Sequence, residues 1–539
     1  MKKILISLLS LSIVITNSFS EKIENIPSGF AKNVILMIPD GMSTEGVTLT
    51  RWFYNNGEPL SLDEIASGMV RTHNSDTIIA DSAPAGTAMA TGHKTQDKLI
   101  GIKPSKSVLY GASMQDEQDA YAPVANVLEM AKLQGKSTGL VSTSEVMHAT
   151  PAAFSAHSTH RKNYNDLGEQ QVYQEINVVF GGGYSYLTKE KRDDKEDMIQ
   201  ILKENGNKVI RTKNELLKLT KNTNKVWGLF AEESLPYDID RKKEDPSLAE
   251  LTKKAIEILS NNKNGFFLMV EGSKVDWAAH SNATIALTSD IKSFDDAVKS
   301  AIDFAKTNKD TLVIVAADHG NGGITIGNRN TSKNYPELPL ESFTAQLKKA
   351  KASELVISEE IFKNKAMSKQ ILKDKLGLEI TDEELKFIQE TKDTTELINV
   401  IVKIVNEKSN IGWTSGGHTG GDVTLYTYAS NQNNRLTGVI QNSDIAKYIE
   451  KAFNGNLENT TKALFVPSNK VKSLGITVNI DNTDKNNPKF LLTKGNKTYT
   501  FFENKNYFEF DNKKTKFNGV VIYNDSEVYF PKDALNLLK

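Results

Sequence analysis

Short runs of apolar residues recur from Asn33 to about Gly323, and segments with helical spacing separate them. The five clearest runs are 33–40, 137–143, 177–183, 265–271 and 311–319. Runs this short and this apolar are typical of buried parallel strands. Their alternation with helical patterns predicts a mostly parallel sheet with helices on both faces.

Side chains that can bind metals stand at the ends of three of these runs. Asp40 ends the first run, Glu271 ends the fourth, and the pair Asp318-His319 ends the fifth. In open α/β sheets, ligands bind at the carboxyl ends of the parallel strands, so these side chains should come together there. This arrangement is typical of a metal-centred hydrolase.

The character of the sequence changes twice further along the chain. From about 328 to 409, Lys, Glu and Ala dominate with helical periodicity, and a strand pattern returns only at 421–428. We interpret 328–409 as a helical insertion over the sheet; the alternative is a solvated helical excursion without chemistry. After about residue 454, polar residues alternate with aromatic and β-branched ones, which predicts a small antiparallel β module at 455–539. The sheet domain would then span 21–454.

The first 20 residues have the pattern of an export signal. Lys2 and Lys3 precede an apolar stretch, and residues 18–20 offer a small-residue cleavage site. We therefore predict a signal peptide at 1–20 and a periplasmic or secreted mature protein. The alternative, a retained anchor helix, is disfavoured by the short apolar core. No later segment of the sequence is apolar enough to span a membrane.

Composition narrows the chemistry further. The 539 residues include 66 Lys and Arg against 67 Asp and Glu, so no basic field favours nucleic acid as a partner. The sequence contains no cysteine, which excludes disulfides, cysteine-bound zinc and thiol nucleophiles. Any transition metal must therefore be held by His and carboxylate ligands.

Ser82 stands where a nucleophile could be placed. It follows Asp81 at the break between a short apolar run, 78–80, and an Ala-rich helix pattern, and we expect it to be the N-cap, with Pro84 in the first turn. A serine there faces free backbone N–H groups and the positive end of the helix dipole, which suits an anion such as phosphate. On this segment alone, a serine that only caps the helix is the simpler interpretation.

A group of His and Asp residues could give Ser82 a metal ion to act with. Asp276 and His280 are four positions apart, on one face of a predicted helix, and His418 lies in a glycine-rich loop. Three ligands leave the open position that a catalytic zinc ion requires. An isolated pair of this kind is more often a surface pair, so the interpretation depends on the other ligand sets.

Two further sets could hold ions beside the first. Asp318 and His319 could combine with Asp40 around a second ion. Asp40, Thr150 and Glu271 would offer hard oxygen ligands, which suit Mg²⁺. Several candidate sets at strand ends in one chain are stronger evidence than any one of them.

Six separated segments of the chain resemble those of alkaline phosphatases, in the order and spacing of that family. They are 40–41, 81–92, 149–152, 271–280, 317–319 and 417–420. The match covers about 33–428 and is highly specific, because unrelated proteins would not share six separated motifs. The resemblance implies the alkaline phosphatase fold, a central, mostly parallel sheet flanked by helices, here with a helical insertion and a C-terminal β module.

The resemblance also implies a role for each matched residue. Ser82 would be the nucleophile that becomes phosphoserine, and Arg161 would bind two phosphate oxygens through its planar guanidinium. The implied ligands of two Zn²⁺ ions and one Mg²⁺ ion are, in turn, Asp276, His280 and His418; Asp40, Asp318 and His319; and Asp40, Thr150 and Glu271. Paired metals of this kind clamp the attacking and leaving oxygens of an in-line displacement.

Two positions near these ligands differ from some bacterial members of the family. His148 stands where those members carry Asp, and Trp277 stands where they carry Lys. Animal and marine or cold-adapted bacterial members are similar to this chain at one or both places. The missing lysine removes a cation beside the phosphate, and His148 can alter the third site, so the ion at that site is less certain than the two zinc ions.

The implied function is the hydrolysis of phosphate monoesters by an exported enzyme. A phosphodiesterase or sulfatase of the same superfamily is the alternative, and Ser82, the third metal set and Arg161 favour monoesters. A noncatalytic phosphate- or surface-binding protein is a further alternative, against which the intact ligand sets argue. Family members are usually dimers, so a homodimer is considered. The module at 455–539 either attaches the enzyme to the cell envelope or packs on the catalytic domain.

Overall fold

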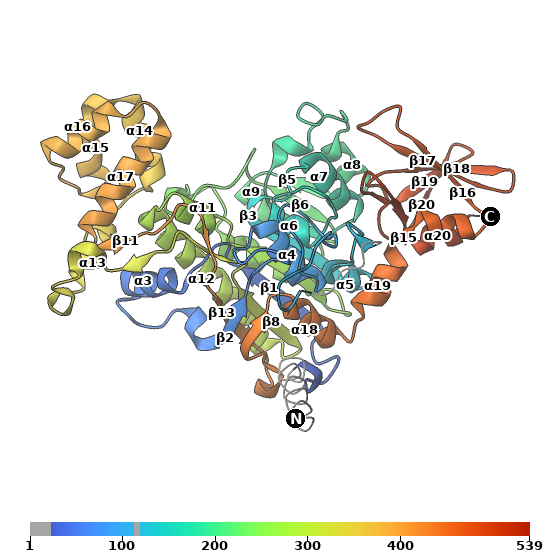
Figure 1. Ribbon diagram of the computed structural model, residues 1–539, viewed down its shortest axis with the longest axis horizontal. Coiled ribbons are helices and arrows are strands. Elements are labelled where there is room, and N and C mark those ends of the chain that lie inside the picture. Colours follow the sequence, from blue (N-terminus) through green and yellow to red (C-terminus); the bar gives the residue numbers. More distant parts are fainter. Residues whose placement is uncertain (1–22, 113–118, 539) are drawn as a thin grey trace, which may run out of the picture.

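A ten-stranded sheet runs through the centre of the molecule (Figure 1). The structure is a computed structural model that describes residues 23–112 and 119–538, so the signal peptide predicted at 1–20 lies outside the described residues. In spatial order the strands are β14 (Gly438–Gln441), β2 (Ala66–Arg71), β13 (Val423–Tyr428), β8 (Thr311–Ala316), β1 (Asn33–Ile38), β7 (Phe266–Glu271), β3 (Ser137–Glu145), β4 (Val178–Gly182), β6 (Val226–Leu229) and β5 (Lys208–Ile210). Strand β13 is antiparallel to both of its neighbours, and the other pairs in this sheet are parallel.

The five apolar runs of the sequence form the strands β1, β3, β4, β7 and β8, as predicted. Every residue of β4, β7 and β8 is buried, and in β1 only Asn33 is partly exposed. Strands that are covered on both faces need apolar residues at every position, which explains why their sequences do not alternate. The mostly parallel sheet predicted from the sequence is confirmed. The run 78–80 lies outside the sheet and forms no strand, and its Ile78 and Ile79 side chains are exposed.

Helices cover both faces of the sheet. One group packs together as α3 (Thr44–Asn55), α10 (Leu248–Leu259), α11 (Lys274–His280) and α12 (Thr284–Thr307). A second group consists of α4 (Ser82–Thr91), α5 (Val127–Leu133), α6 (Ala149–Ala153) and α18 (Asp444–Phe453). Helix α10 begins with a capping box, in which the Ser247 side chain accepts from Glu250 N while the Glu250 carboxylate accepts from Ser247 N. No helix among the described residues is both long and apolar enough to cross a membrane.

The predicted insertion forms a separate lobe of helices at one end of the molecule (Figure 1). This insertion lobe contains α13 (Glu341–Thr344), α14 (Glu354–Lys363), α15 (Ser368–Leu376), α16 (Asp382–Glu390) and α17 (Thr394–Lys408). A short antiparallel pair, β10 (Thr325–Ile326) with β11 (Ile411–Gly412), joins its two ends. The buried Glu354 carboxylate accepts from the backbone N–H groups of Ile285 and Ala286 in the first turn of α12, at 2.8 and 3.2 Å. An acid at this helix end is favoured by the free N–H groups and the helix dipole, and it ties the lobe to the sheet domain.

The C-terminal module, residues 466–538, is built from two small antiparallel sheets, and the predicted β character of the tail is confirmed. The larger sheet contains β16 (Thr477–Asp481), β17 (Lys489–Lys494), β18 (Lys497–Phe502), β19 (Tyr507–Phe510) and β20 (Lys513–Lys516); the smaller contains β15 (Val466–Pro467), β22 (Val528–Phe530) and β21 (Ile522–Tyr523). Phe490, Phe501, Phe508 and Phe530 are buried in a core distinct from that of the central sheet. Helix α19 (Leu457–Leu464), which precedes the module, packs on α5.

Truncation after Phe465 should leave a soluble protein that still binds metal and has a lowered Tm. Most buried apolar residues of the module form its own aromatic core. Leu457, Leu464 and Phe465 pack with the core of the central sheet, as do four residues of the module: Tyr507, Val520, Ile522 and Tyr529. A core that folds within its own segment can be removed without unfolding the remainder. Differential scanning calorimetry and elemental analysis of the truncated protein would check this. Recovery of only insoluble, metal-free protein would show that the module is an integral part of the catalytic domain.

Candidate active site

The carboxyl ends of β1, β7 and β8 bring four buried side chains together. Asp40 comes two residues after β1, Glu271 is the last residue of β7, and Asp318-His319 follows β8. Neighbouring parallel strands place these ends side by side; Ile38, for example, is paired with Glu271. All four side chains are inaccessible to solvent. The prediction that these residues meet at one end of the sheet is therefore confirmed.

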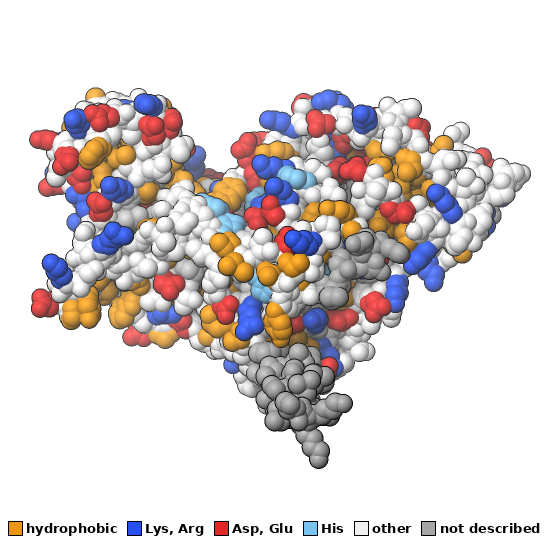
Figure 2. Space-filling model, in the orientation of Figure 1, with side chains coloured by type: hydrophobic (Ala, Val, Ile, Leu, Met, Phe, Trp, Pro, Cys, Tyr) orange, Lys and Arg blue, Asp and Glu red, His pale blue; other side chains and the backbone are white. Residues whose placement is uncertain are grey.

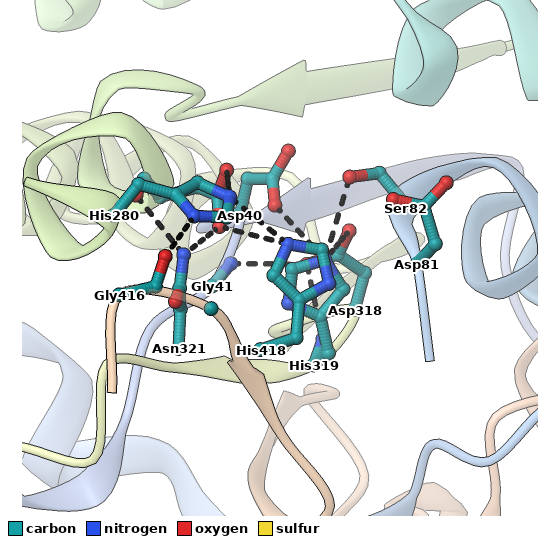
Figure 3. A network of polar contacts seen from close by, with 12 residues as sticks. Asp40, Gly41, Asp81, Ser82, His280, Asp318, His319, Asn321, Gly416 and His418 are labelled. Atoms are coloured by element: carbon teal, nitrogen blue, oxygen red, sulfur yellow. Dashed lines mark hydrogen bonds and ion pairs between the residues drawn. The ribbon is translucent and has the colours of Figure 1, made fainter. Parts of the chain in front are cut away.

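A second group of side chains lies beside the first, on α11 and on a short strand (Figure 3). His280 Nε2 lies 3.3 Å from Asp276 Oδ2, and His418 Nε2 lies 3.1 Å from His280 Nε2 and 3.6 Å from Asp276 Oδ1. Ligand atoms bound about 2.0–2.1 Å from a tetrahedral zinc ion stand about 3.3–3.4 Å apart. The spacing of these three side chains therefore suits one zinc ion.

Backbone pairing explains why His418 reaches this group across a long stretch of sequence. It lies on β12 (His418–Thr419), which pairs antiparallel with β9 (Gly320–Asn321), the segment that follows His319 directly. The rings of His319 and His418 are stacked with their centroids 3.7 Å apart. The glycine-rich sequence around His418 predicted a bent loop, and the structure adds that a short strand pair fixes it.

Hydrogen bonds turn both histidines so that Nε2 faces Asp276. His280 Nδ1 lies 2.9 Å from the Gly416 carbonyl, and His418 Nδ1 lies 2.8 Å from the Ala80 carbonyl. A carbonyl only accepts, so each Nδ1 carries a proton and each Nε2 is the nitrogen that faces the place of a metal ion. Outer partners of this kind orient the ligands of metal sites.

Asn321 is a site residue that the sequence did not single out. Its Nδ2 donates to Asp276 Oδ1 at 2.6 Å and to the Asp276 carbonyl at 3.2 Å. Its position two residues after His319 is the one sequence feature that points to it. The pairing of β9 with β12, which holds this segment beside Asp276, cannot be predicted from the local sequence. Asn321 fixes the orientation of the Asp276 carboxylate.

The first group of side chains is arranged around Asp40. His319 Nε2 lies 3.5 Å from Asp40 Oδ1 and 3.3 Å from Asp318 Oδ2, and the backbone N–H groups of Gly41 and His319 donate to Asp318 Oδ1. Asp40 also belongs to a second set of donor atoms, in which its carboxylate, the Glu271 carboxylate and a His148 ring nitrogen lie within 4.8 Å of one another. Asp40 is thus shared between two sets of donor atoms.

Several buried polar atoms of this cluster have no hydrogen-bond partner among the residues that the structure describes. They are both carboxylate oxygens of Asp40, Oδ2 of Asp318, Oε1 of Glu271, Oγ1 of Thr150 and Nδ1 of His148. Buried polar groups are nearly always paired, and unpaired buried charges are costly. Bound cations would satisfy these atoms, so the residues present fit a metal centre.

The pKa values of these groups follow from burial and crowding. Burial raises the pKa of Asp40 well above its usual range, and the charges of Asp318 and Asp276 add to the effect. Burial also raises the pKa of Glu271, to about 8. The hydrogen bond to Asp276 raises the pKa of His280 to about 9. The metal-free cluster therefore retains protons that bound metal ions would have to displace.

Ser82 lies beside the metal-binding cluster, at the start of α4. It is buried, and its Oγ is 3.4 Å from His319 Nε2 (Figure 3). The prediction that Ser82 is the N-cap is wrong by one position: Asp81 has the extended backbone of the N-cap, and Ser82 is the first residue of the helix. Asp81 makes no side-chain capping hydrogen bond. The Ser82 hydroxyl and the N–H groups at the start of α4 therefore stand next to the metal ligands.

Arg161 reaches the same place from a loop. Its Nη1 donates to Asp81 Oδ2 at 2.5 Å, which explains why Asp81 does not cap the helix, and its Nη2 lies 3.2 Å from His148 Nε2. Burial alone would lower the pKa of Arg161, but the charge of Asp81 outweighs burial and raises it. Burial, followed by the charge of Arg161, lowers the pKa of His148 to about 3. A neutral His148 therefore lies between the guanidinium and the Asp40–Glu271 cluster.

Trp277 packs against His148. The two rings meet edge to face with their centroids 5.8 Å apart, and Lys274 Nζ lies 3.9 Å from the Trp277 ring centroid. A cation thus remains near the position where some relatives carry lysine, but it stacks on the indole. The exposed His280 opens the group to solvent, and Figure 2 shows histidine atoms at the surface near the base of the insertion lobe.

Comparisons with known proteins agree with this geometry. The family model described as alkaline phosphatase matches residues 31–454. The curated relative Alkaline phosphatase 4 of Bacillus subtilis (strain 168) is 39% identical over 437 residues, which cover 78% of this chain and 88% of the relative. The family-model match ends at residue 454, before α19 and the C-terminal module.

Solved structures give the same result. The cold-active alkaline phosphatase from Shewanella sp. has a TM-score of 0.69 and 29% identity, and the match covers 78% of this chain and 99% of that chain. A variant of TAB5 alkaline phosphatase, in which a histidine is replaced by glutamate and Mg is bound in the M3 site, has a TM-score of 0.57 and 26% identity. That match covers 80% of this chain and 100% of the TAB5 chain.

Zinc, through His280, and magnesium, through Glu271, should both bind the metal-free protein more tightly as the pH rises from 6.5 to 8. Glu271, with a pKa of about 8, and His280, with a pKa of about 9, hold protons in this range that they must lose as ligands. Each displaced proton adds roughly 1.4 kcal/mol to the binding free energy per pH unit. Both pKa values are raised on folding, so the stability that these groups give the metal-free protein is lost as the pH rises through them.

Isothermal titration calorimetry in buffers of different protonation enthalpy would measure the affinity and the number of protons released. The matched control is Glu271→Gln, which has no carboxylate to titrate and should release fewer protons when magnesium binds but as many when zinc binds. Zinc binding without proton release, or affinity that falls between pH 6.5 and 8, would contradict the prediction.

Proposed function

The chain belongs to the alkaline phosphatase family, and from this premise we propose that it is an exported, metal-dependent enzyme that hydrolyses phosphate monoesters through a phosphoserine on Ser82. One observation carries the proposal: the Ser82 hydroxyl, at the amino end of α4, lies 3.4 Å from His319 within a cluster of unpaired buried carboxylates. A hydroxyl beside a metal-binding cluster is the usual arrangement of an activated nucleophile.

The residues around Ser82 suit the binding of a phosphate group. Two nonbridging oxygens would accept from the Arg161 guanidinium, which Asp81 holds in orientation. The N–H groups at the start of α4 and the dipole of that helix would add positive potential at the same place. The phosphorus would then face the Ser82 hydroxyl.

The reaction would proceed in two displacements at phosphorus. Ser82 Oγ loses its proton and attacks the phosphorus, and the ester oxygen leaves and takes up a proton as the alcohol. A water molecule then attacks the phosphoserine, which frees the Ser82 oxygen and releases inorganic phosphate. Bound metal ions supply the charge that stabilises the ionised Ser82 oxygen and the leaving oxygen.

We propose two zinc ions and one magnesium ion as cofactors. The zinc ions would be held by Asp276, His280 and His418 and by Asp40, Asp318 and His319. Magnesium would be held by Asp40, Thr150 and Glu271. The Mg bound in the M3 site of a TAB5 variant supports magnesium at this site, where a His148 nitrogen also lies near the carboxylates of Asp40 and Glu271.

Arg161 favours monoesters over the alternative, a phosphodiesterase or sulfatase of the same superfamily. A monoester presents a terminal phosphate with two negative charges, whereas diesters and sulfate esters carry one. A guanidinium aimed at nonbridging oxygens therefore gains most from the monoester.

Export and assembly remain predictions from the sequence. The pattern at 1–20 supports a periplasmic or secreted location. The homodimer, and attachment to the cell envelope through the C-terminal module, rest on the resemblance and on the sequence alone.

Ser82→Ala should abolish phosphoserine formation and lower kcat by about a thousandfold or more, because the first displacement loses its nucleophile. Acid quenching of the enzyme with radiolabelled phosphate would detect the phosphoserine, and a chromogenic monoester would report kcat. Bound metal and Tm should match the unmodified protein. Near-normal turnover with normal metal content would remove Ser82 from this role.

Arg161→Ala should raise the inhibition constant of inorganic phosphate by about 10- to 150-fold, as expected for the loss of a charge-assisted contact worth roughly 1.5–3 kcal/mol. The loss in kcat/KM should be larger for a monoester than for a diester with the same leaving group. Zinc content serves as the control, since Arg161 contacts no zinc ligand. Equal losses on both substrates would favour the diesterase interpretation.

A further inference from the structure

The turn between β18 and β19 of the C-terminal module is buried against α7 (Tyr164–Tyr173), the helix that follows the loop carrying Arg161. Asn504, in this turn, is 3% exposed. Its Nδ2 donates to Asp166 Oδ1 at 3.4 Å and to Glu169 Oε2 at 3.3 Å, and its Oδ1 accepts from Gln170 Nε2 at 2.9 Å. These α7 residues are spaced i, i+3 and i+4, so the turn covers one face of the helix.

The residue after Asn504 reinforces this contact. Lys505 Nζ lies 3.4 Å from Glu169 Oε1, forms an ion pair with Glu196, and stands 5.7 Å from the ring centroid of Tyr173. Tyr173, one turn after Glu169, packs its ring against Tyr507 with centroids 6.0 Å apart. A buried lysine is tolerated only when it is paired, so the ion pairs of Lys505 with Glu169 and Glu196 fix the position of this turn on α7.

Gln170 continues the contact to the loop that carries Arg161. Its Oε1 accepts from His157 N at 2.7 Å, and its Nε2 donates to the His157 carbonyl at 2.9 Å as well as to Asn504. His157 is therefore held through its backbone at the start of the loop, and α7 itself begins at Tyr164, where the loop ends. Arg161 lies between these two fixed points, and its own N–H donates to the Lys98 carbonyl at 2.8 Å.

We propose that Asn504 is a positioning residue for Arg161, so that a segment outside the family-matched region, 31–454, supports the phosphate site. Asn504 fixes the Gln170 amide, Gln170 fixes the backbone of His157, and the loop presents Arg161 to Asp81. A bidentate contact depends on the direction of the guanidinium plane, so small shifts of the loop weaken phosphate binding. The inference rests on the proposed role of Arg161.

The test is Asn504→Gly, compared with Asn512→Gly as a matched control. Both asparagines have a left-handed backbone, φ 62° and 60°, which glycine adopts without strain, and both are in turns of the same sheet. The Asn512 side chain is exposed. Asn504→Gly should raise the inhibition constant of inorganic phosphate about three- to tenfold, as the loss of one neutral hydrogen bond predicts, with zinc content unchanged. Asn512→Gly should leave that constant unchanged.

The same substitution in the Arg161→Ala background separates positioning from general loosening. There, Asn504→Gly should have no further effect on phosphate inhibition, since the group it positions is gone. An equal effect in both backgrounds, or an effect on Tm without one on phosphate inhibition, would overturn the proposal. Asn504→Ser is a second variant with the same expectations. If Arg161→Ala alone leaves phosphate inhibition unchanged, the proposed role of Arg161 fails instead.

Discussion

Mutual repulsion among buried carboxylates is the constraint on which the rest of this structure depends. Asp40, Glu271, Asp318 and Asp276 lie at the same end of one sheet, and several of their oxygens have no hydrogen-bond partner among the described residues. Such a group is tolerated only if protons or cations compensate its charge and the surrounding elements hold it in place. The three strands β1, β7 and β8, buried on both faces, provide that rigidity.

The other parts of the site follow from this constraint. The strand pair β9–β12 brings His418 to Asp276, and backbone carbonyls direct the histidine rings. Arg161 reaches the site from a loop, with its charge compensated by Asp81. Asp81 is the N-cap of the helix that begins at Ser82, so the guanidinium and the Ser82 hydroxyl are held at the same helix end. A dianionic phosphate fits this place because the cationic groups and the helix N-terminus face it.

The strands and most site residues could be predicted from sequence because their signals are local. Apolar runs identified the five central strands, and the Asp, Glu and His residues at the ends of three of these runs identified the centre of the metal-binding cluster. Asn321, the pairing of Asp81 with Arg161, and the approach of Asn504 to α7 could not be predicted in the same way. Each depends on a contact between segments distant in sequence, for which no local pattern exists. The one-position error at Ser82 has a similar origin. Asp81 is the N-cap, but its carboxylate accepts from Arg161, a residue distant in sequence, and makes no capping hydrogen bond.

The pair β10–β11 has a consequence for the entropy of the chain. The insertion lobe separates His319 from His418, and a flexible segment of that length would oppose their meeting in one centre. Because Thr325 pairs with Gly412 and Ile326 with Ile411, the lobe leaves and returns at one point, and the effective loop between the two histidines is reduced to the short segments 320–325 and 412–417. An insertion of this kind can change in size during evolution while the distance between the ligands stays the same.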